Sequence, residues 1–247
     1  MIRMIIIAII AAIPLSAIDM TVYTNAHDLY NRGQFAEALE RYKSIARSAA
    51  DPDIYYDLGA TYLALNDVGH AVLWFNRALK RAPDDADTRG GLRMANALTV
   101  DRIDAPTTPS MVQAMLFFYY KIPLTMQAIL VIVFATLIAL SLISFILFDS
   151  TLIQRIAFAA GTASIALTIL FAASAVVRYR TQFPENAAVV TAKESNVLNG
   201  SEDGYTVLIT LHAGTVVVIR DVRQKYALIT LANGVSGWIL REAIERI

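Results

Sequence analysis

The hydrophobic pattern first marks two long apolar runs in the second half of the chain. Residues 127–148 and 156–177 each comprise 22 residues without a charged side chain. As an α-helix each run would be about 33 Å long, which is enough to cross a hydrocarbon layer of about 30 Å. The segment between them, 149–155, is so short that the two helices must form an antiparallel hairpin. We therefore predict two transmembrane helices, with small residues at 159–164 favouring close helix contact.

A shorter apolar run lies near the N-terminus. Arg3 precedes an apolar stretch of about 11 residues, Met4–Pro14, and Ala17 follows shortly before the first acidic residue. This stretch is too short to span the hydrocarbon layer. We expect residues 1–17 to be an export signal peptide that is cleaved after Ala17, and an uncleaved membrane anchor is the alternative.

Two signals disagree about the side of the membrane on which the soluble parts lie. The short loop contains Arg155, whereas Lys121, Arg178 and Arg180 flank the two spans at their other ends. Because basic residues are enriched on the cytoplasmic side, this distribution would place both soluble parts in the cytoplasm. An export signal places them on the opposite side. We give the export signal the greater weight because the first hydrophobic segment usually dominates orientation.

Between residues 18 and 100 the apolar positions follow a helical period, and the pattern repeats after 33 residues. In the sharper copy, small residues allow two antiparallel helices to approach closely, aromatic residues fill the space between them, and a proline ends the second helix. These positions are Tyr55, Leu58, Gly59, Tyr62, Ala71, Phe75, Ala78 and Pro83. They resemble the tetratricopeptide repeat at all of its signature positions. A more degenerate copy covers 19–50, and a helix over 84–98 is expected to cap the array.

The resemblance to this repeat implies a concave face lined by the first helix of each pair. The residues on that face would be Tyr23, His27, Tyr30, Asn31, Tyr56, Ala60 and Leu63. Such an aromatic groove fits a peptide or a partner helix, and the alternative is that these side chains pack internally or face solvent. Some members of the family hold a terminal carboxylate with basic and amide side chains. Asp53 and Asp57 lie at nearby positions here, so we do not expect a ligand of that kind.

Residues 101–126 separate the repeats from the first predicted span. They begin with a polar stretch, 101–110, whose two prolines suit a linker. The next segment, 111–124, carries the aromatic and basic side chains that favour the lipid headgroup level. We therefore predict an interfacial segment there, and a second linker over 178–186.

From residue 187 to residue 247 the pattern changes to short runs of β-forming residues with turn signals between them. The runs fall at 187–192, 205–211, 215–221, 226–231 and 236–240. Through Leu211–Val216, Tyr226 and Asn233–Ile239 this region resembles a bacterial SH3-like barrel. The resemblance implies a ligand surface at Tyr226 and Trp238, as in family members that bind cell-wall peptides. The alternative places Trp238 in the barrel core with one exposed edge.

The amino-acid composition excludes several classes of binding site and catalytic activity. Of the 247 residues 56% are hydrophobic and 17% charged, with 21 basic and 21 acidic side chains and no cysteine. The balanced charge offers no electrostatic basis for binding nucleic acid, and the lack of cysteine excludes disulfides and thiolate-bound zinc. His27, His70 and His212 are isolated from one another, and no nucleophile or phosphate-binding motif accompanies them. We expect no metal, no cofactor and no enzymatic activity.

The order of these modules resembles the BatE family of the Bacteroides aerotolerance (Bat) system along the entire chain. The resemblance implies a multi-module protein of the bacterial inner membrane with α-helical tetratricopeptide repeats, two transmembrane helices and a small all-β SH3-like barrel, both soluble modules being periplasmic. It also implies partners, namely membrane lipid, envelope proteins, other Bat proteins and a MoxR-type ATPase system. We expect a non-catalytic scaffold that recruits envelope proteins through the repeat groove. The alternative is a cell-wall anchor whose SH3-like domain holds peptidoglycan peptides.

Overall fold

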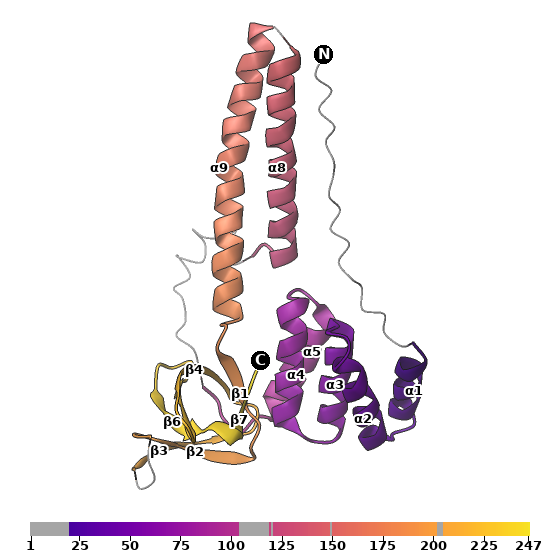
Figure 1. Ribbon diagram of the computed structural model, residues 1–247, viewed down its shortest axis with the longest axis vertical. Coiled ribbons are helices and arrows are strands. Elements are labelled where there is room, and N and C mark those ends of the chain that lie inside the picture. Colours follow the sequence, from indigo (N-terminus) through magenta and orange to yellow (C-terminus); the bar gives the residue numbers. More distant parts are fainter. Residues whose placement is uncertain (1–19, 104–118, 120, 149, 202–204) are drawn as a thin grey trace.

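The computed structural model describes residues 20–103, 119, 121–148, 150–201 and 205–247. It consists of a layer of short helices, a long helical hairpin and an antiparallel sheet, and the helical layer and the sheet lie together at one end of the hairpin (Figure 1). The expected signal peptide, 1–17, and most of the expected interfacial segment, 111–124, lie outside the described residues.

The helical layer contains pairs of antiparallel helices followed by one further helix. Within the described residues these are α1 (Met20–Asn31), α2 (Phe35–Ala46), α3 (Pro52–Ala64), α4 (Val68–Arg81) and α5 (Ala86–Leu98). Three helices begin after an aspartate that accepts a hydrogen bond from an N–H of the first turn, namely Asp51, Asp67 and Asp85. The boundaries therefore follow the capping residues and agree with a helical repeat array.

Phe75 is the side chain around which the second repeat packs. A Cβ atom added to Gly59 would lie 2.7 Å from Phe75 Cδ1, and one added to Gly91 would lie 2.6 Å from Phe75 Cε1. The ring is therefore held between α3 and α5, each of which approaches it with a glycine. Phe75 is fully buried together with Tyr42 and Leu58. These glycine contacts are the close helix approach that the repeat spacing predicts.

The hairpin consists of α8 (Leu124–Leu147) and α9 (Thr151–Gln182). Both helices are long and apolar enough to cross a membrane. Their bounds differ from the sequence prediction, because α9 begins at Thr151 and continues to Gln182. Residues 178–182, expected as linker, are therefore helical, since a helix does not end where its apolar run ends. The connecting loop is correspondingly shorter than 149–155.

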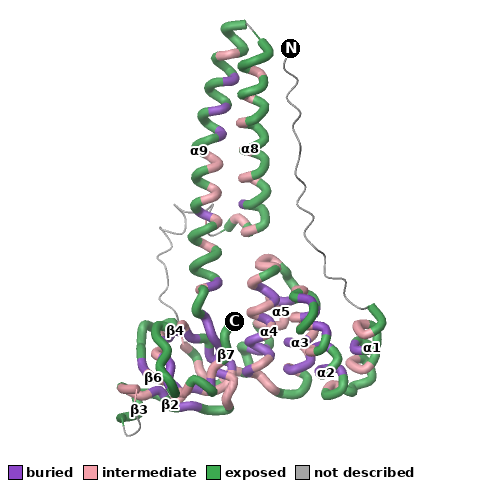
Figure 2. Tube along the Cα trace, viewed as in Figure 1, coloured by how far each residue is buried: buried purple, intermediate pink, exposed green. Residues whose placement is uncertain are grey.

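Small residues line the contact between the two helices of the hairpin. Ala157, Gly161 and Ser164 are buried against α8, and the Ser141 hydroxyl donates to the carbonyl oxygen of Ala157. The other small residues of 159–164 face outward. Away from this seam most residues of both helices are exposed, as the green colour along the hairpin in Figure 2 shows. Many of these exposed residues are large and apolar. None of the most apolar window of α8 and 17% of that of α9 is buried, so these are not core helices of the described fold.

The C-terminal part forms an antiparallel sheet with strand order β3-β2-β6-β5-β4-β1-β7. Its elements are β1 (Ala187–Val190), β2 (Glu194–Leu198), β3 (Val207–His212), β4 (Val216–Val222), β5 (Tyr226–Thr230), β6 (Ser236–Leu240), a 3₁₀ turn (Arg241–Ala243) and β7 (Ile244–Arg246). The five predicted runs correspond to β1, β3, β4, β5 and β6, while β2 and β7 were not predicted. Gly214 and Gly234 have φ values of 94° and 89° in the turns before β4 and β6. An all-β C-terminal region is thus confirmed, and its SH3-like identity stays a prediction.

The sheet and the repeats share packed side chains. Strand β1 packs against α4, and Val189 of β1 is fully buried within the hydrophobic core of the repeats. Gly69 of α4 permits this approach, because a Cβ there would lie 3.1 Å from Val190 O. Arg77 of α4 donates hydrogen bonds to Glu245 Oε1 at 2.9 Å and to the carbonyl oxygen of Arg246 at 2.6 Å. The two soluble modules therefore form one packed unit, which their sequence patterns did not predict.

A second connection between the modules is made by Asp101, just after the repeats. Its Oδ1 lies 2.8 Å from His212 Nδ1, and its Oδ2 accepts from the His212 N–H at 2.7 Å and from the Thr215 hydroxyl at 2.5 Å. Burial opposes ionisation of Asp101, but the hydrogen bonds from Thr215 and His212 outweigh it and hold the pKa of this carboxyl below its ordinary value. Asp101 thereby joins the end of the repeats to the β3–β4 turn.

Candidate functional site

The residues expected on the concave face come from α1 and α3, the first helices of the two pairs. Tyr23, His27, Tyr30 and Asn31 lie on α1, and Tyr56, Ala60 and Leu63 lie on α3. The structure half-buries Tyr23, Tyr30, Tyr56, Ala60 and Leu63 against the core of the repeats, and leaves His27 and Asn31 exposed. Most of these side chains therefore pack on one side and remain accessible on another, and their use as a binding groove stays a prediction.

Ring contacts fix the tyrosines of this face. The Tyr23 ring stacks on His27 at 6.3 Å between centroids and meets the buried Tyr42 edge-on at 6.3 Å. The Tyr56 ring lies 5.8 Å from the ring of Phe75. Aromatic side chains held in this way offer contact area to a partner without first losing rotamer freedom.

Asp57 of α3 adds a carboxylate to these aromatic residues. Burial raises the pKa of Asp57 to about 6, while the Tyr23 hydroxyl and His27 act in the opposite direction by favouring its charged form. Its Oδ2 atom is buried and has no hydrogen-bond partner in the part of the chain that the structure describes. The hydrogen bond from Tyr23 offsets part of the cost of burying this carboxyl, and a positively charged group beside it would offset more.

Further carboxylates surround the same tyrosines. Burial and the field of Asp57 together raise the pKa of Tyr23. Burial also raises the pKa of Tyr56, with further contributions from Asp87 and Asp57. Asp85, which caps α5, and Asp87, in its first turn, thus act on this face as well as at the start of that helix. We call the surface formed by Tyr23, Tyr30, Tyr56 and Asp57 the acidic aromatic face.

Only part of this face, namely its tyrosines, is predicted by the sequence. From the sequence, Asp57 argued only against a ligand that presents a terminal carboxylate. The available signal was an aspartate within the pattern Tyr55-Tyr56-Asp57-Leu58, where the next residue is fully buried.

The candidate residues of the sheet lie on neighbouring strands, where Tyr226 of β5 pairs with Leu240 and Trp238 of β6 pairs with Leu228. Tyr226 of β5 is only 6% exposed. Trp238 of β6 is half-buried and lies outside the buried core cluster, because its neighbours Gly237 and Ile239 are the buried residues of the strand. The Arg223 guanidinium lies 4.8 Å from the Trp238 ring centroid. The expectation that Trp238 belongs to the core is therefore wrong, since alternation along β6 turns it to the other face.

A cavity of about 350 Å³ lies beside Tyr226. Glu194, Ser195, Asn196, Leu198 and Leu240 complete its lining. Elsewhere, no group of three or more histidine, aspartate or glutamate side chains among the described residues is placed to hold a metal ion.

Comparison with known proteins gives a family match for the helical repeats. Residues 23–86 match the family model of the tetratricopeptide repeat. This confirms the repeat interpretation for both helix pairs and indicates a role in protein interaction, since such repeats are typically non-catalytic binding modules. No curated protein matches the chain.

Proposed function

We propose that this protein is a non-catalytic, membrane-anchored scaffold that recruits a protein partner through the acidic aromatic face of its repeats. The single observation that carries the proposal is the buried Oδ2 of Asp57, which lacks a hydrogen-bond partner among the described residues and lies among fixed tyrosines. A lysine or arginine side chain would pair with this carboxylate and stack on the tyrosine rings. The partner therefore presents a basic segment.

The hairpin supplies the membrane anchor in this proposal. Many of its exposed residues are large and apolar, and such residues are stable in contact with lipid or with other transmembrane helices. The repeats and the sheet then share one side of the membrane, which we place in the periplasm at the bacterial inner membrane on the strength of the export signal. Envelope proteins, including other Bat proteins and those of a MoxR-type ATPase system, are the partners that the module order favours.

Site-specific photo-crosslinking in intact cells tests the recruitment step. A benzophenone amino acid replaces the exposed His27 on the acidic aromatic face, or Glu37 on α2 as a control position. We expect a defined adduct from position 27 and not from position 37. Asp57→Asn should reduce the adduct at least tenfold, and Tyr30→Ala with Tyr56→Ala should remove it, whereas Glu37→Gln should leave it unchanged. An adduct that survives the Asp57 and tyrosine substitutions contradicts recruitment by this face.

The cavity beside Tyr226 favours a second candidate, the cell-wall anchor. In this alternative the SH3-like domain holds a peptidoglycan peptide against Tyr226 and Leu240, with Trp238 nearby on the adjoining strand. Co-sedimentation of the full chain with purified sacculi tests it. A chain that remains in the supernatant at all ratios leaves the sheet with a structural role.

A further inference from the structure

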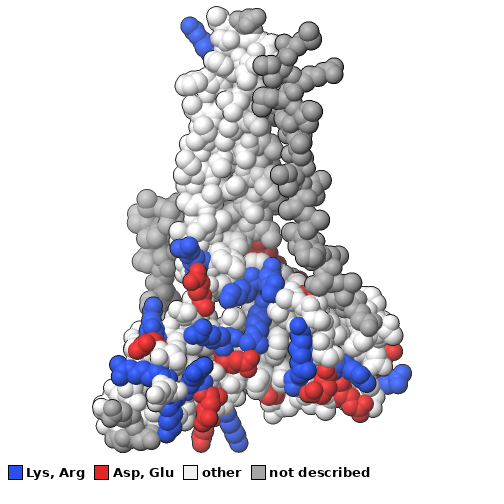
Figure 3. All heavy atoms as spheres, in the orientation of Figure 1, with Lys and Arg blue, Asp and Glu red and all other residues white. Residues whose placement is uncertain are grey.

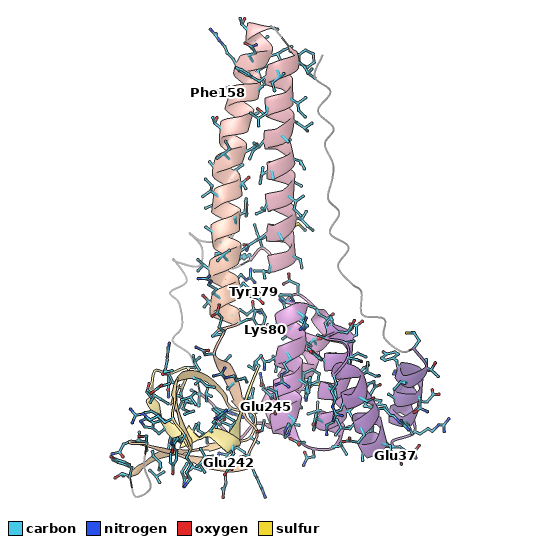
Figure 4. All side chains as sticks on the ribbon, viewed as in Figure 1. Glu37, Lys80, Phe158, Tyr179, Glu242 and Glu245 are labelled. Atoms are coloured by element: carbon cyan, nitrogen blue, oxygen red, sulfur yellow. The ribbon has the colours of Figure 1, made fainter. Side chains whose placement is uncertain are left out.

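A second cavity lies between the end of α4, the end of α9 and the last strand. It has a volume of about 530 Å³ and is lined by Tyr55, Arg77, Lys80, Arg81, Tyr179 and Ile247. Three of these six residues are basic and two are tyrosines, so the cavity suits an anion. Figure 4 shows Lys80 and Tyr179 where the foot of the hairpin meets the helical layer.

The basic side chains of this cavity differ in how they are engaged. Arg77 is committed to the sheet, because its guanidinium bonds Glu245 and lies 4.5 Å from the Trp74 ring centroid. Lys80 donates to the carbonyl oxygen of Ile247 at 3.2 Å and keeps two further donors. The Arg81 guanidinium lies 5.6 Å from the Tyr55 ring centroid and forms no ion pair with any residue that the structure describes. Lys80 and Arg81 are thus the groups available to an anion.

The height of the cavity relative to the hairpin is fixed by a direct contact. The Tyr179 hydroxyl donates to the carbonyl oxygen of Lys80 at 3.3 Å. Tyr179 follows the last apolar residue of the span, Val177, by two positions, which is about 3 Å along a helix. The polar layer on each side of a bilayer is about 5–8 Å thick, so in a bilayer crossed by the hairpin the end of α4 would lie within that layer.

The base of α8 reaches the same end of the repeats. Asp84, in the turn after α4, accepts hydrogen bonds from the Thr125 N–H at 2.7 Å and from its hydroxyl at 2.8 Å. Arg178 of α9 donates to the carbonyl oxygens of Tyr119 and Ile122. In the space-filling view, basic side chains gather at the foot of the hairpin, and a further basic side chain marks its far end, with an uncharged surface between them (Figure 3). Basic residues in the last turn of a helix also offset its dipole, but that role alone requires neither the cavity nor the tyrosine of α9 beside it.

We propose that this cavity binds the phosphate group of an anionic phospholipid in the leaflet that faces the repeats. Lys80 and Arg81 contact the phosphate oxygens, and the tyrosine rings flank the headgroup, a level at which tyrosine is enriched. This inference rests on the membrane-spanning hairpin of the proposed function.

Native mass spectrometry of the full chain in a neutral detergent tests the proposal. The protein receives equimolar phosphatidylglycerol and phosphatidylcholine, and we expect one phosphatidylglycerol to be retained in preference. Lys80→Gln with Arg81→Gln should reduce this retention at least tenfold, because each basic side chain near an anionic headgroup contributes a factor of about five. Arg32→Gln with Arg47→Gln removes two exposed cations from the first repeat and should leave retention unchanged.

Two further arms separate the possible failures. Inorganic phosphate at millimolar concentration should not displace the lipid, and complete displacement would make a free anion the ligand and overturn the proposal. Flotation with neutral phosphatidylcholine vesicles tests the hairpin independently of the cavity. A chain that floats with neutral vesicles yet shows no preference for phosphatidylglycerol refutes the lipid site alone, whereas a chain that does not float refutes the membrane anchor and the lipid site together.

Discussion

The acidic aromatic face and the end of α4 both present tyrosines, but the charged side chains beside these tyrosines are acidic on the face and basic at the end of α4. On the face, Tyr23 and Tyr56 lie near Asp57, whose pKa is raised to about 6. At the end of α4, Tyr55 lies beside Arg81 and lines a cavity with Lys80. The neighbouring residues Tyr55 and Tyr56 therefore serve surfaces that attract opposite ions. One small helical layer can in this way present a protein-binding surface and a lipid-binding surface without overlap.

Among the substitutions that test this comparison, Phe75→Ala is expected to have the largest effect. It should destabilise the repeats and thereby disrupt both surfaces. The ring lies between α3 and α5 and contacts Tyr56, so its loss should destabilise the repeats by about 3–5 kcal/mol. Thermal unfolding of the full chain in detergent, followed by circular dichroism, measures this. Phe158→Ala removes an exposed ring of the hairpin and serves as the control, with an expected change within about 0.5 kcal/mol. Equal effects of the two substitutions would contradict the packing role of Phe75.

A smaller effect is expected from Asp101→Asn, which should loosen the sheet while leaving the acidic aromatic face intact. Loss of a charge-assisted contact to His212 and Thr215 should cost about 2 kcal/mol. Because the folded-state pKa of Asp101 is depressed, this stability is present above the ordinary aspartate pKa and is lost as the pH falls through the folded value. Hydrogen exchange at the β3–β4 turn reports it. Exchange that is unaffected by both the substitution and acid would show that the contact carries no stability.

The smallest effect is expected from Asp57→Asn, which should raise stability while it weakens partner binding. The folded-state pKa of about 6 lies above that of the unfolded chain, so ionised Asp57 opposes folding increasingly as the pH rises from about 4 to 6. Allowing for partial solvation, we expect a gain on the order of 1 kcal/mol at pH 7 that disappears by pH 4. Urea unfolding at both pH values measures it. A loss of stability at pH 7 would indicate that Asp57 serves the fold instead of a ligand.

The sequence predicted those parts of the fold that are encoded by a sufficiently long pattern of apolar positions within one continuous segment. The second repeat, the two apolar helices and five strands each carry a full period of apolar positions. Strand β2 was missed because Glu194–Leu198 contains only two apolar residues, and β7 because it spans three residues. Such short runs give no reliable alternation.

Contacts between distant segments could not be predicted from the same patterns. The Asp101–His212 pair joins positions 111 residues apart, and nothing in either segment alone indicates the other. The concave tyrosines were predictable because the repeat fixes which helix faces inward. The cavity at the end of α4 combines side chains from α3, α4 and α9 with Ile247 after β7, so it required the assembled structure.

The hydrogen bonds that join the ends of α8 and α9 to the repeats restrict how the repeats can move relative to the hairpin. Because Thr125 is held by Asp84 and Tyr179 by the carbonyl oxygen of Lys80, both spans meet the helical layer at one corner. In a bilayer this attachment would hold the acidic aromatic face at a fixed distance from the lipid surface and in a fixed orientation. A flexible linker would not restrict either. The partner proposed above would need to present its basic segment at the same distance from the membrane. Among proteins of equal charge, the scaffold would therefore select those whose basic segment extends to that distance.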